Sequence, residues 1–185
     1  MPCPGGVGLG LLIITPALWQ HDTRLNKRMK TLVLGLGNSI LTDDGVGLRV
    51  AAEIDKRNAW PGVTVVRSEL GGLNLLELLV GYDKAVILDA IHTKDGKPGQ
   101  IYKLNEASAE ASHHANSAHG IDFKGVIELG RRLGLDLPDE FVIFAIEAAD
   151  TTSFGEKLTP AVERAVPLCV EEVIEELNDP ATILS

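Results

Sequence analysis

The stretch TLVLGLGNSILTDDGVGLRVAAEI, residues 31–54, contains the pattern that decides the fold. Its first six residues form a continuous apolar run bounded by glycine, which is typical of a strand buried on both faces of a sheet. Apolar side chains then recur with helical spacing between Asp44 and Arg57. The stretch therefore predicts a strand, a loop and a helix, which together are the repeating unit of a parallel α/β sheet.

The same alternation continues along the chain. Strand patterns follow at 63–68, 84–91, 100–104 and 141–148, and helix patterns at 73–80, 121–133 and 159–177. Residues 92–99, between the third and fourth strands, are too few for a crossover helix, so the fourth strand is expected to run antiparallel at an edge. The sequence thus predicts a doubly wound α/β/α sandwich whose five-stranded sheet is mostly parallel, with one antiparallel strand.

The last two helices carry more specific expectations. Leu133 at the end of the third helix is expected to point into the core. Thr159 should cap the final helix, with Pro160 at its first position. Pro167 lies inside that helix and is expected to kink it or to mark a restart.

Residues 1–28 differ from the rest of the chain. Their apolar run, GVGLGLLIITPALW, is shorter than the roughly 20 residues that a membrane-spanning helix requires. No basic residue precedes the run, as one would in a signal peptide. Because the first strand begins just after Met29, we expect 1–28 to be a non-core N-terminal extension and 29–185 to be a single α/β domain. A weak membrane anchor is the alternative interpretation of the extension.

Charge and cysteine content narrow the class of partner. The chain has 17 basic and 26 acidic residues and a formal net charge of −9. Such a surface repels a phosphate backbone, so nucleic acid is not an expected partner, whereas cationic ligands, metal ions and basic peptides remain compatible. Cys3 and Cys169 match no zinc or redox spacing. They are expected to be free thiols, as in a reducing cytoplasm.

Three polar segments follow or adjoin the predicted strands. They are the loop GLGNSILTDDGVG at 35–47, Asp89 at the end of the third strand, and the loop SHHANSAHG at 112–120. Open α/β sheets place their sites at the carboxyl ends of the strands, where Asp44, Asp89 and His119 can all reach one edge. Two carboxylates and one imidazole with open positions are typical of a divalent metal site.

Each of these residues also has a structural interpretation. Asp43 could cap the following helix, and Asp44 could complement its dipole. The carboxylate of Asp89 could accept a hydrogen bond from a loop amide. His113 and His114 are expected to be solvated loop residues. It is the expected convergence of three ligands at one edge that favours a metal site.

Dinucleotide binding is disfavoured by the same first loop. The fingerprint requires a third glycine where Ile40 stands. Asp43 and Asp44 would also place two carboxylates where a pyrophosphate should bind. The sequence contains no HExxH, GxSxG, P-loop or CxxC motif.

In four segments the chain resembles the nickel–iron hydrogenase maturation endopeptidases. These segments are GLGNSILTDDGVG (35–47), VILDAI (86–91), SAHG (117–120) and LTPAVERAVP (158–167). The resemblance implies a mixed, doubly wound α/β/α sandwich. It also implies that Asp44, Asp89 and His119 bind metal. Two departures stand out: Asp44 replaces the glutamate of well-studied members, and SELGGLN (68–74) replaces an acid followed by Gly-Gly-Thr, where Glu69 is a candidate for that acid.

The resemblance also implies an activity. Members of the family remove a C-terminal extension from the precursor of the hydrogenase large subunit once nickel is installed. Nickel would arrive with the substrate, and Asp44, Asp89 and His119 would complete its coordination, although other divalent metals are also compatible with such a site. Hydrolysis could use the metal as a Lewis acid or a carboxylate that activates water, and no residue is assigned as the nucleophile. The alternatives are a non-enzymatic nickel-binding maturation factor and a nucleotide-binding regulator.

Overall fold

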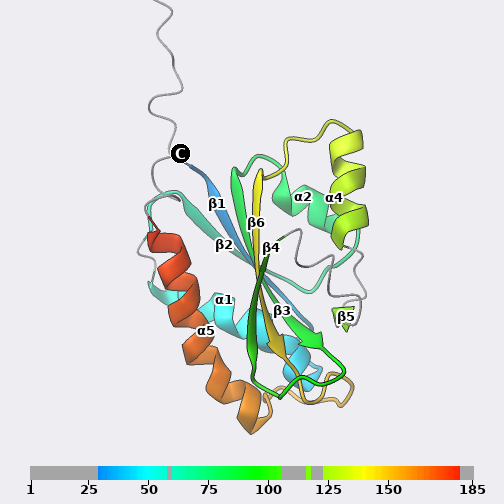
Figure 1. Cartoon of the computed structure of the whole chain (residues 1–185), viewed down its shortest axis with the longest axis vertical. Coiled ribbons are helices and arrows are strands. Elements are labelled where there is room, and N and C mark those ends of the chain that lie inside the picture. The colour runs from blue at the N-terminus through cyan, green and yellow to red at the C-terminus, as the bar shows by residue number, and fades with distance from the viewer. Residues whose placement is uncertain (1–28, 58–59, 106–115, 118–122, 180–185) are drawn as a thin grey trace, which may run out of the picture.

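The computed structural model describes residues 29–57, 60–105, 116–117 and 123–179, and its central element is a twisted sheet (Figure 1). The five main strands are β1 (Thr31–Leu36), β2 (Val63–Ser68), β3 (Lys84–His92), β4 (Ile101–Asn105) and β6 (Glu140–Glu147). They lie in the order β2-β1-β3-β6-β4. The extension at 1–28 lies outside the described residues.

Strand directions agree with the sequence analysis. β1 pairs in parallel with β2 and β3, and β3 pairs in parallel with β6. β4 runs antiparallel to β6 at the edge of the sheet, as the short connection predicted. One pairing was not predicted: β5 (Asn116–Ser117), within the polar loop, adds two residues antiparallel to the end of β3.

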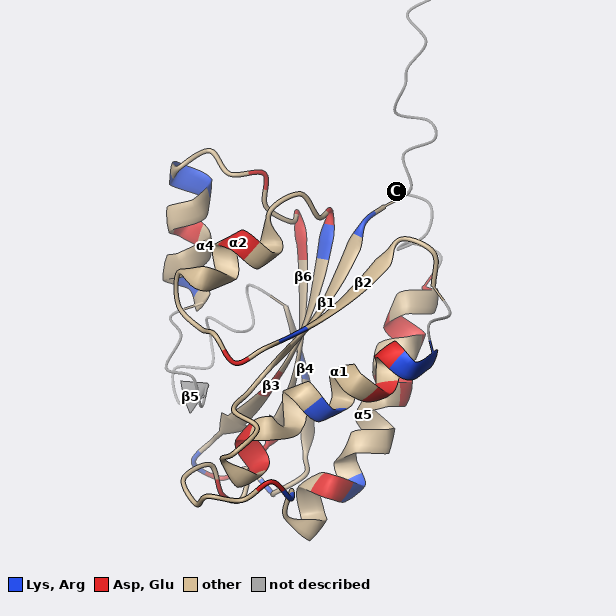
Figure 2. Cartoon of the chain, turned by 180° about the vertical axis from the view of Figure 1, so that it is seen from behind, with Lys and Arg blue, Asp and Glu red and all other residues tan. Residues whose placement is uncertain are grey.

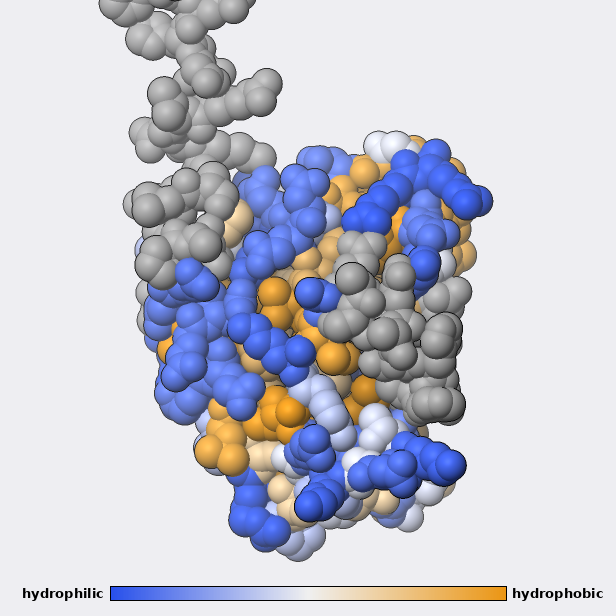
Figure 3. All heavy atoms as spheres, viewed as in Figure 1, coloured by the Kyte–Doolittle hydropathy of each residue, from blue (hydrophilic) through white to orange (hydrophobic). Residues whose placement is uncertain are grey.

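Helices cover both faces of the sheet. α1 (Val46–Arg57) and α5 (Pro160–Asn178) lie together on one face, and α2 (Asn74–Leu79) and α4 (Phe123–Arg132) lie on the other (Figures 1 and 2). Even-numbered residues of β3 pack against α1 and α5, and odd-numbered residues against α2 and α4, because successive side chains of a strand alternate. The predicted doubly wound sandwich is confirmed. Hydrophobic surface is visible between α5 and α4 in Figure 3.

The helix ends differ from the sequence-based expectations. A short 3-10 helix, η2 (Thr42–Gly45), precedes α1, which therefore begins at Val46 rather than at Asp44. Leu133 is 64% exposed, so its predicted burial was wrong, because α4 ends one residue earlier. α5 continues through Pro167 without a restart. Pro167 is on the exposed side of α5, where water can satisfy the carbonyl that loses its hydrogen bond.

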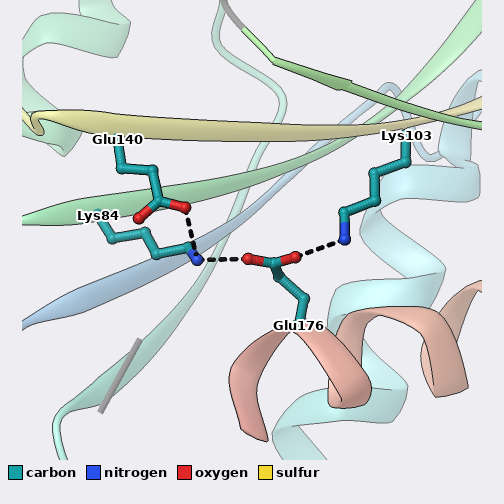
Figure 4. Close-up of polar contacts among 4 residues, drawn as sticks. All are labelled: Lys84, Lys103, Glu140 and Glu176. Atoms are coloured by element: carbon teal, nitrogen blue, oxygen red, sulfur yellow. Dashed lines mark hydrogen bonds and ion pairs between the residues drawn. The ribbon is translucent and has the colours of Figure 1, made fainter. Parts of the chain in front are cut away.

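A partly buried group of charged side chains, which was not predicted from the sequence, joins the sheet to α5 (Figure 4). Lys84 is only 1% exposed and forms ion pairs with Glu176 and, at 2.8 Å between Nζ and Oε1, with Glu140. Glu176 also pairs with Lys103, with 2.6 Å between its Oε2 and the Lys103 Nζ. We call these four residues the Lys84 cluster. It lies at the amino end of β3, away from Asp89.

The charges in the Lys84 cluster stabilise one another against the cost of burial. Burial by itself would lower the pKa of Lys84, but hydrogen bonds to Glu140 and Glu176 outweigh it and raise that pKa above its ordinary value. Burial would likewise raise the pKa of Glu176, yet hydrogen bonds from Lys103 and Lys84 lower it. Lys84 and Glu176 are therefore both charged at neutral pH.

Candidate functional site

Glycines bring the loop after β1 into direct contact with the carboxyl ends of two strands. A Cβ atom on Gly47 would lie 2.3 Å from the carbonyl oxygens of both Leu36 and Leu88. A Cβ on Gly35 would lie 2.5 Å from the Gly47 carbonyl oxygen. Only glycine permits this approach, so the glycines of the motif serve helix–strand packing. The first turn of α1, and η2 just before it, are thereby fixed against β1 and β3.

Two of the three predicted metal ligands lie on these contacting elements. Asp44 belongs to η2 and is 3% exposed, and Asp89 lies near the carboxyl end of β3 and is 7% exposed. η2 contacts β3 directly. The Oδ1 atom of Asp89 accepts a hydrogen bond of 2.8 Å from the Ala90 amide, the adjacent residue of the same strand. Both carboxylates are thus nearly buried at the carboxyl edge of the sheet.

His119 lies outside the described residues, as do His113 and His114. The nearest described part of their loop is β5, in which Ser117 is paired with Ile91. Ser117 precedes His119 by two positions, and Ile91 follows Asp89 by two positions. Among the described residues alone, no three His, Cys, Asp or Glu side chains are grouped closely enough to hold a metal ion.

Asp43 has a structural role that differs from the predicted helix cap. Its carboxylate accepts hydrogen bonds from the amides of Ala149 and Asp150 at 2.9 and 3.0 Å. It also accepts bonds from the amide and the hydroxyl of Thr159 at 2.6 and 2.9 Å. Thr159 is the N-cap residue of α5 by position, with Pro160 following, but its hydroxyl bonds to Asp43 rather than to the helix. Asp43 therefore anchors the loop after β6 and the start of α5.

Glu147 is a further buried acid at this edge, and it was not predicted from the sequence. It is 2% exposed, and its carboxylate accepts hydrogen bonds from the amide and the hydroxyl of Thr93, at 2.7 and 2.9 Å. These bonds hold the loop that follows β3. The available signal was the same as for Asp89, namely an acid that ends an apolar strand.

Glu69 links the loop after β2 to the loop after β1. Its Oε1 atom accepts hydrogen bonds from the Ser39 hydroxyl at 2.6 Å and from the Ser39 amide at 3.3 Å. These bonds hold the pKa of the Glu69 carboxyl below its ordinary value, so it remains ionised near neutral pH. The exposed carboxylate of Glu69 thus lies beside the motif that contains Asp44.

An open groove of about 630 Å³ runs over the exposed side of α1 beside these loops. Its lining includes Ser39, Thr42, Arg49, Arg67, Lys157 and Glu163. The groove adjoins the loop after β1 and reaches the start of α5. Gly45, which follows Asp44 in the chain, is part of its lining.

The carboxyl edge of the sheet thus combines several buried acids with a groove beside the loop after β1. A family model described as hydrogenase maturation protease matches residues 48–176, and the chain belongs to that family. It is therefore a peptidase of hydrogenase maturation, as the sequence motifs predicted.

Individual relatives agree with this assignment. The chain is 28% identical to the hydrogenase 2 maturation protease of Escherichia coli (strain K12), over 82% of this chain and 92% of the relative. It is 31% identical to the hydrogenase expression/formation protein HupD of Bradyrhizobium diazoefficiens, over 72% of this chain and 70% of the relative.

Solved structures show the same fold. The hydrogenase maturating endopeptidase HybD from E. coli superposes with a TM-score of 0.72 at 27% identity, covering 82% of this chain and 93% of that one. The [NiFe] hydrogenase maturation protease HybD from Thermococcus kodakarensis has a TM-score of 0.61 at 27% identity, covering 80% and 99%. The predicted family, fold and enzyme class are therefore confirmed.

Proposed function

We propose that this protease removes the C-terminal extension of a nickel–iron hydrogenase large-subunit precursor after nickel insertion. It recognises the nickel, which the substrate carries, through Asp44, Asp89 and His119. The observation that carries this proposal is the convergence of three chain segments at the carboxyl edge: η2, the end of β3, and β5.

The chemistry of these residues supports a cation at this edge. Asp44 and Asp89 are both nearly buried on elements that contact each other, and a divalent ion bound by both would neutralise their charges. Imidazole and carboxylate are suitable ligands for nickel and leave coordination positions for the thiolates of the substrate. A protease that supplies only part of the coordination sphere would distinguish a nickel-loaded precursor from an empty one, because the empty form lacks the anchor.

We place this activity in the cytoplasm. Cys169, in the described part of the chain, is a free thiol, and its burial raises its pKa to about 12. Among the helices of the described residues, none combines the length and the hydrophobicity needed to cross a bilayer. The alternative of a nickel carrier without peptidase activity is disfavoured by the family to which the chain belongs.

The test compares cleavage of nickel-loaded and nickel-free precursor, read as a mobility shift of the large subunit. The wild-type protein is expected to process only the loaded form. Asp89→Asn retains the shape but removes the charge, and His119→Ala removes the nitrogen ligand, so both are expected to abolish processing while the fold is retained. His113→Ala is the control and should have little effect. Equal cleavage of the two precursor forms would refute nickel recognition, and full activity of Asp89→Asn would refute the site.

A further inference from the structure

We propose that exposed apolar side chains around the carboxyl edge form the surface on which the folded body of the precursor docks. This apolar rim consists of Ile40, Leu70, Leu73 and Phe154. The inference rests on the proposed function, because it assumes that a folded protein presents its metal to this edge. It adds a recognition surface distinct from the metal ligands and from the groove over α1.

Each member of the apolar rim is unusually accessible for a large apolar side chain. Ile40, Leu70 and Leu73 are 51%, 60% and 61% exposed, and Phe154 is 84% exposed. A single exposed apolar residue is ordinary on a protein surface. Four that gather on the loops around one site mark an interaction surface. Aromatic and large aliphatic side chains of this kind are the usual anchors of protein interfaces.

Hydrogen bonds fasten the three loops that carry the apolar rim. The Gly155 amide donates to the Ile40 carbonyl oxygen at 3.0 Å, and the Thr42 amide donates to the Gly155 carbonyl oxygen at 2.8 Å. These bonds bring Phe154 beside the loop after β1. The Glu69–Ser39 hydrogen bonds bring Leu70 to the other side of the same loop. Ile40, Phe154 and Leu70 therefore lie on adjoining loops, and Leu73 follows Leu70 by three positions in the chain.

Further hydrogen bonds hold the loop that carries Phe154 in place. The Oδ1 atom of Asp150 accepts hydrogen bonds from the amides of Thr152 and Ser153 at 3.0 and 2.9 Å. The Thr42 hydroxyl donates to the Ser153 carbonyl oxygen at 2.8 Å. A surface held in place before binding loses little conformational entropy when a partner docks. This favours a partner that is itself folded, with a fixed shape to match.

Charge distinguishes the precursor from a second copy of this chain. Two copies, each with a net charge of −9, would repel one another on approach. The rim also adjoins Asp44, next to which the metal of the substrate must come. A precursor that carries a metal ion brings positive charge to this edge, next to Asp44. A second copy of this chain brings no such ion and adds further negative charge.

The experiment measures the initial rate of processing against the concentration of nickel-loaded precursor for the full chain and its variants. Phe154→Asp should raise the half-saturating precursor concentration by about tenfold or more, while the maximal rate stays within about twofold. The double variant Leu70→Ser/Leu73→Ser should shift it in the same direction. Leu168→Asp is the matched control, because Leu168 is 62% exposed on α5 outside the rim. It should leave both parameters unchanged.

Each other outcome overturns a specific claim. If the Phe154 and Leu70/Leu73 variants match the Leu168 control, the rim is not a docking surface. If the wild-type protein cleaves no precursor, the proposed function fails. Docking is then tested by the binding of the precursor to immobilised wild-type and Phe154→Asp protein. Weaker binding to the variant would support docking on the rim, and equal binding would refute it. If sedimentation shows a wild-type dimer that Phe154→Asp dissociates, the occupant is a second copy and the proposal is wrong.

Discussion

Replacing Glu176 with glutamine is expected to destabilise the protein, because it leaves the Lys84 ammonium buried with too little negative charge. Glu176 is 9% exposed and Lys84 is 1% exposed, so water cannot take the place of the lost carboxylate. Removing one partner of a fully buried ion pair costs about 3–5 kcal/mol. Lys84 keeps its ion pair with the half-exposed Glu140, so we expect a loss of about 2–3 kcal/mol in the free energy of unfolding.

A second substitution tests whether the loss comes from the unpaired charge. Removing both charges in Lys84→Met/Glu176→Leu replaces the pair by apolar side chains of similar size, which is often neutral or stabilising. We expect the double variant to lie within about 1 kcal/mol of the wild type. The variant Glu175→Gln, at the exposed neighbouring position, is the control and should change stability by less than about 0.5 kcal/mol.

The assay is urea denaturation at pH 7 followed by circular dichroism, together with a thermal melt. A loss of 2–3 kcal/mol corresponds to a fall of about 4–12 °C in Tm for a chain of this size. If Glu176→Gln and Glu175→Gln were equally stable, the Lys84 cluster would not stabilise the fold. If the double variant were less stable than Glu176→Gln, the cost would come from packing rather than from charge.

Two further predictions concern pH and the anchoring of α5. Because the pKa of Glu176 is lowered and that of Lys84 is raised, their contribution should be complete between the ordinary pKa values of the two groups. The free energy of unfolding should fall below about pH 4.5, as Glu176 is protonated, and above about pH 10.5, as Lys84 loses its proton. Urea titrations across that pH range should show both of these losses to be smaller in Lys84→Met/Glu176→Leu. Asp43→Ala should cost about 2–3 kcal/mol in unfolding free energy, because it removes a buried carboxylate that accepts four hydrogen bonds from partly buried donors. A loss below about 1 kcal/mol would contradict the anchoring role.

The strands and their directions were predictable because the relevant signals are local. The apolar runs set the strand positions, and the short connection at 92–99 was enough to reverse β4. The ends of the helices were harder to predict from the sequence, because the burial of Leu133 depends on where α4 ends in the folded chain. The pairing of β5 was also missed, because Asn116 and Ser117 lie in a polar loop with no apolar alternation.

Side-chain roles were harder to predict where they depend on distant partners. The sequence pointed to Asp89 through its place at the end of an apolar strand, but the same signal at Glu147 has a structural explanation in Thr93. Nothing local distinguishes Asp43 from Asp44, since the partners of Asp43 lie more than 100 residues away. The Lys84 cluster likewise joins positions that only the folded chain brings together.

The close approach of Gly47 to the carbonyl oxygens of Leu36 and Leu88 has a consequence for sequence divergence. Main-chain atoms, rather than interlocking side chains, set the position of the first turn of α1 on the sheet. Core residues farther along that helix, such as Val50 and Ile54, can therefore be exchanged without displacing the segment that carries Asp44. Substitutions of core residues can thus accumulate without changing the geometry of the carboxyl edge. This independence is consistent with a family in which the backbone fold is shared although only 27% of the residues are identical, as in the comparison with HybD from E. coli.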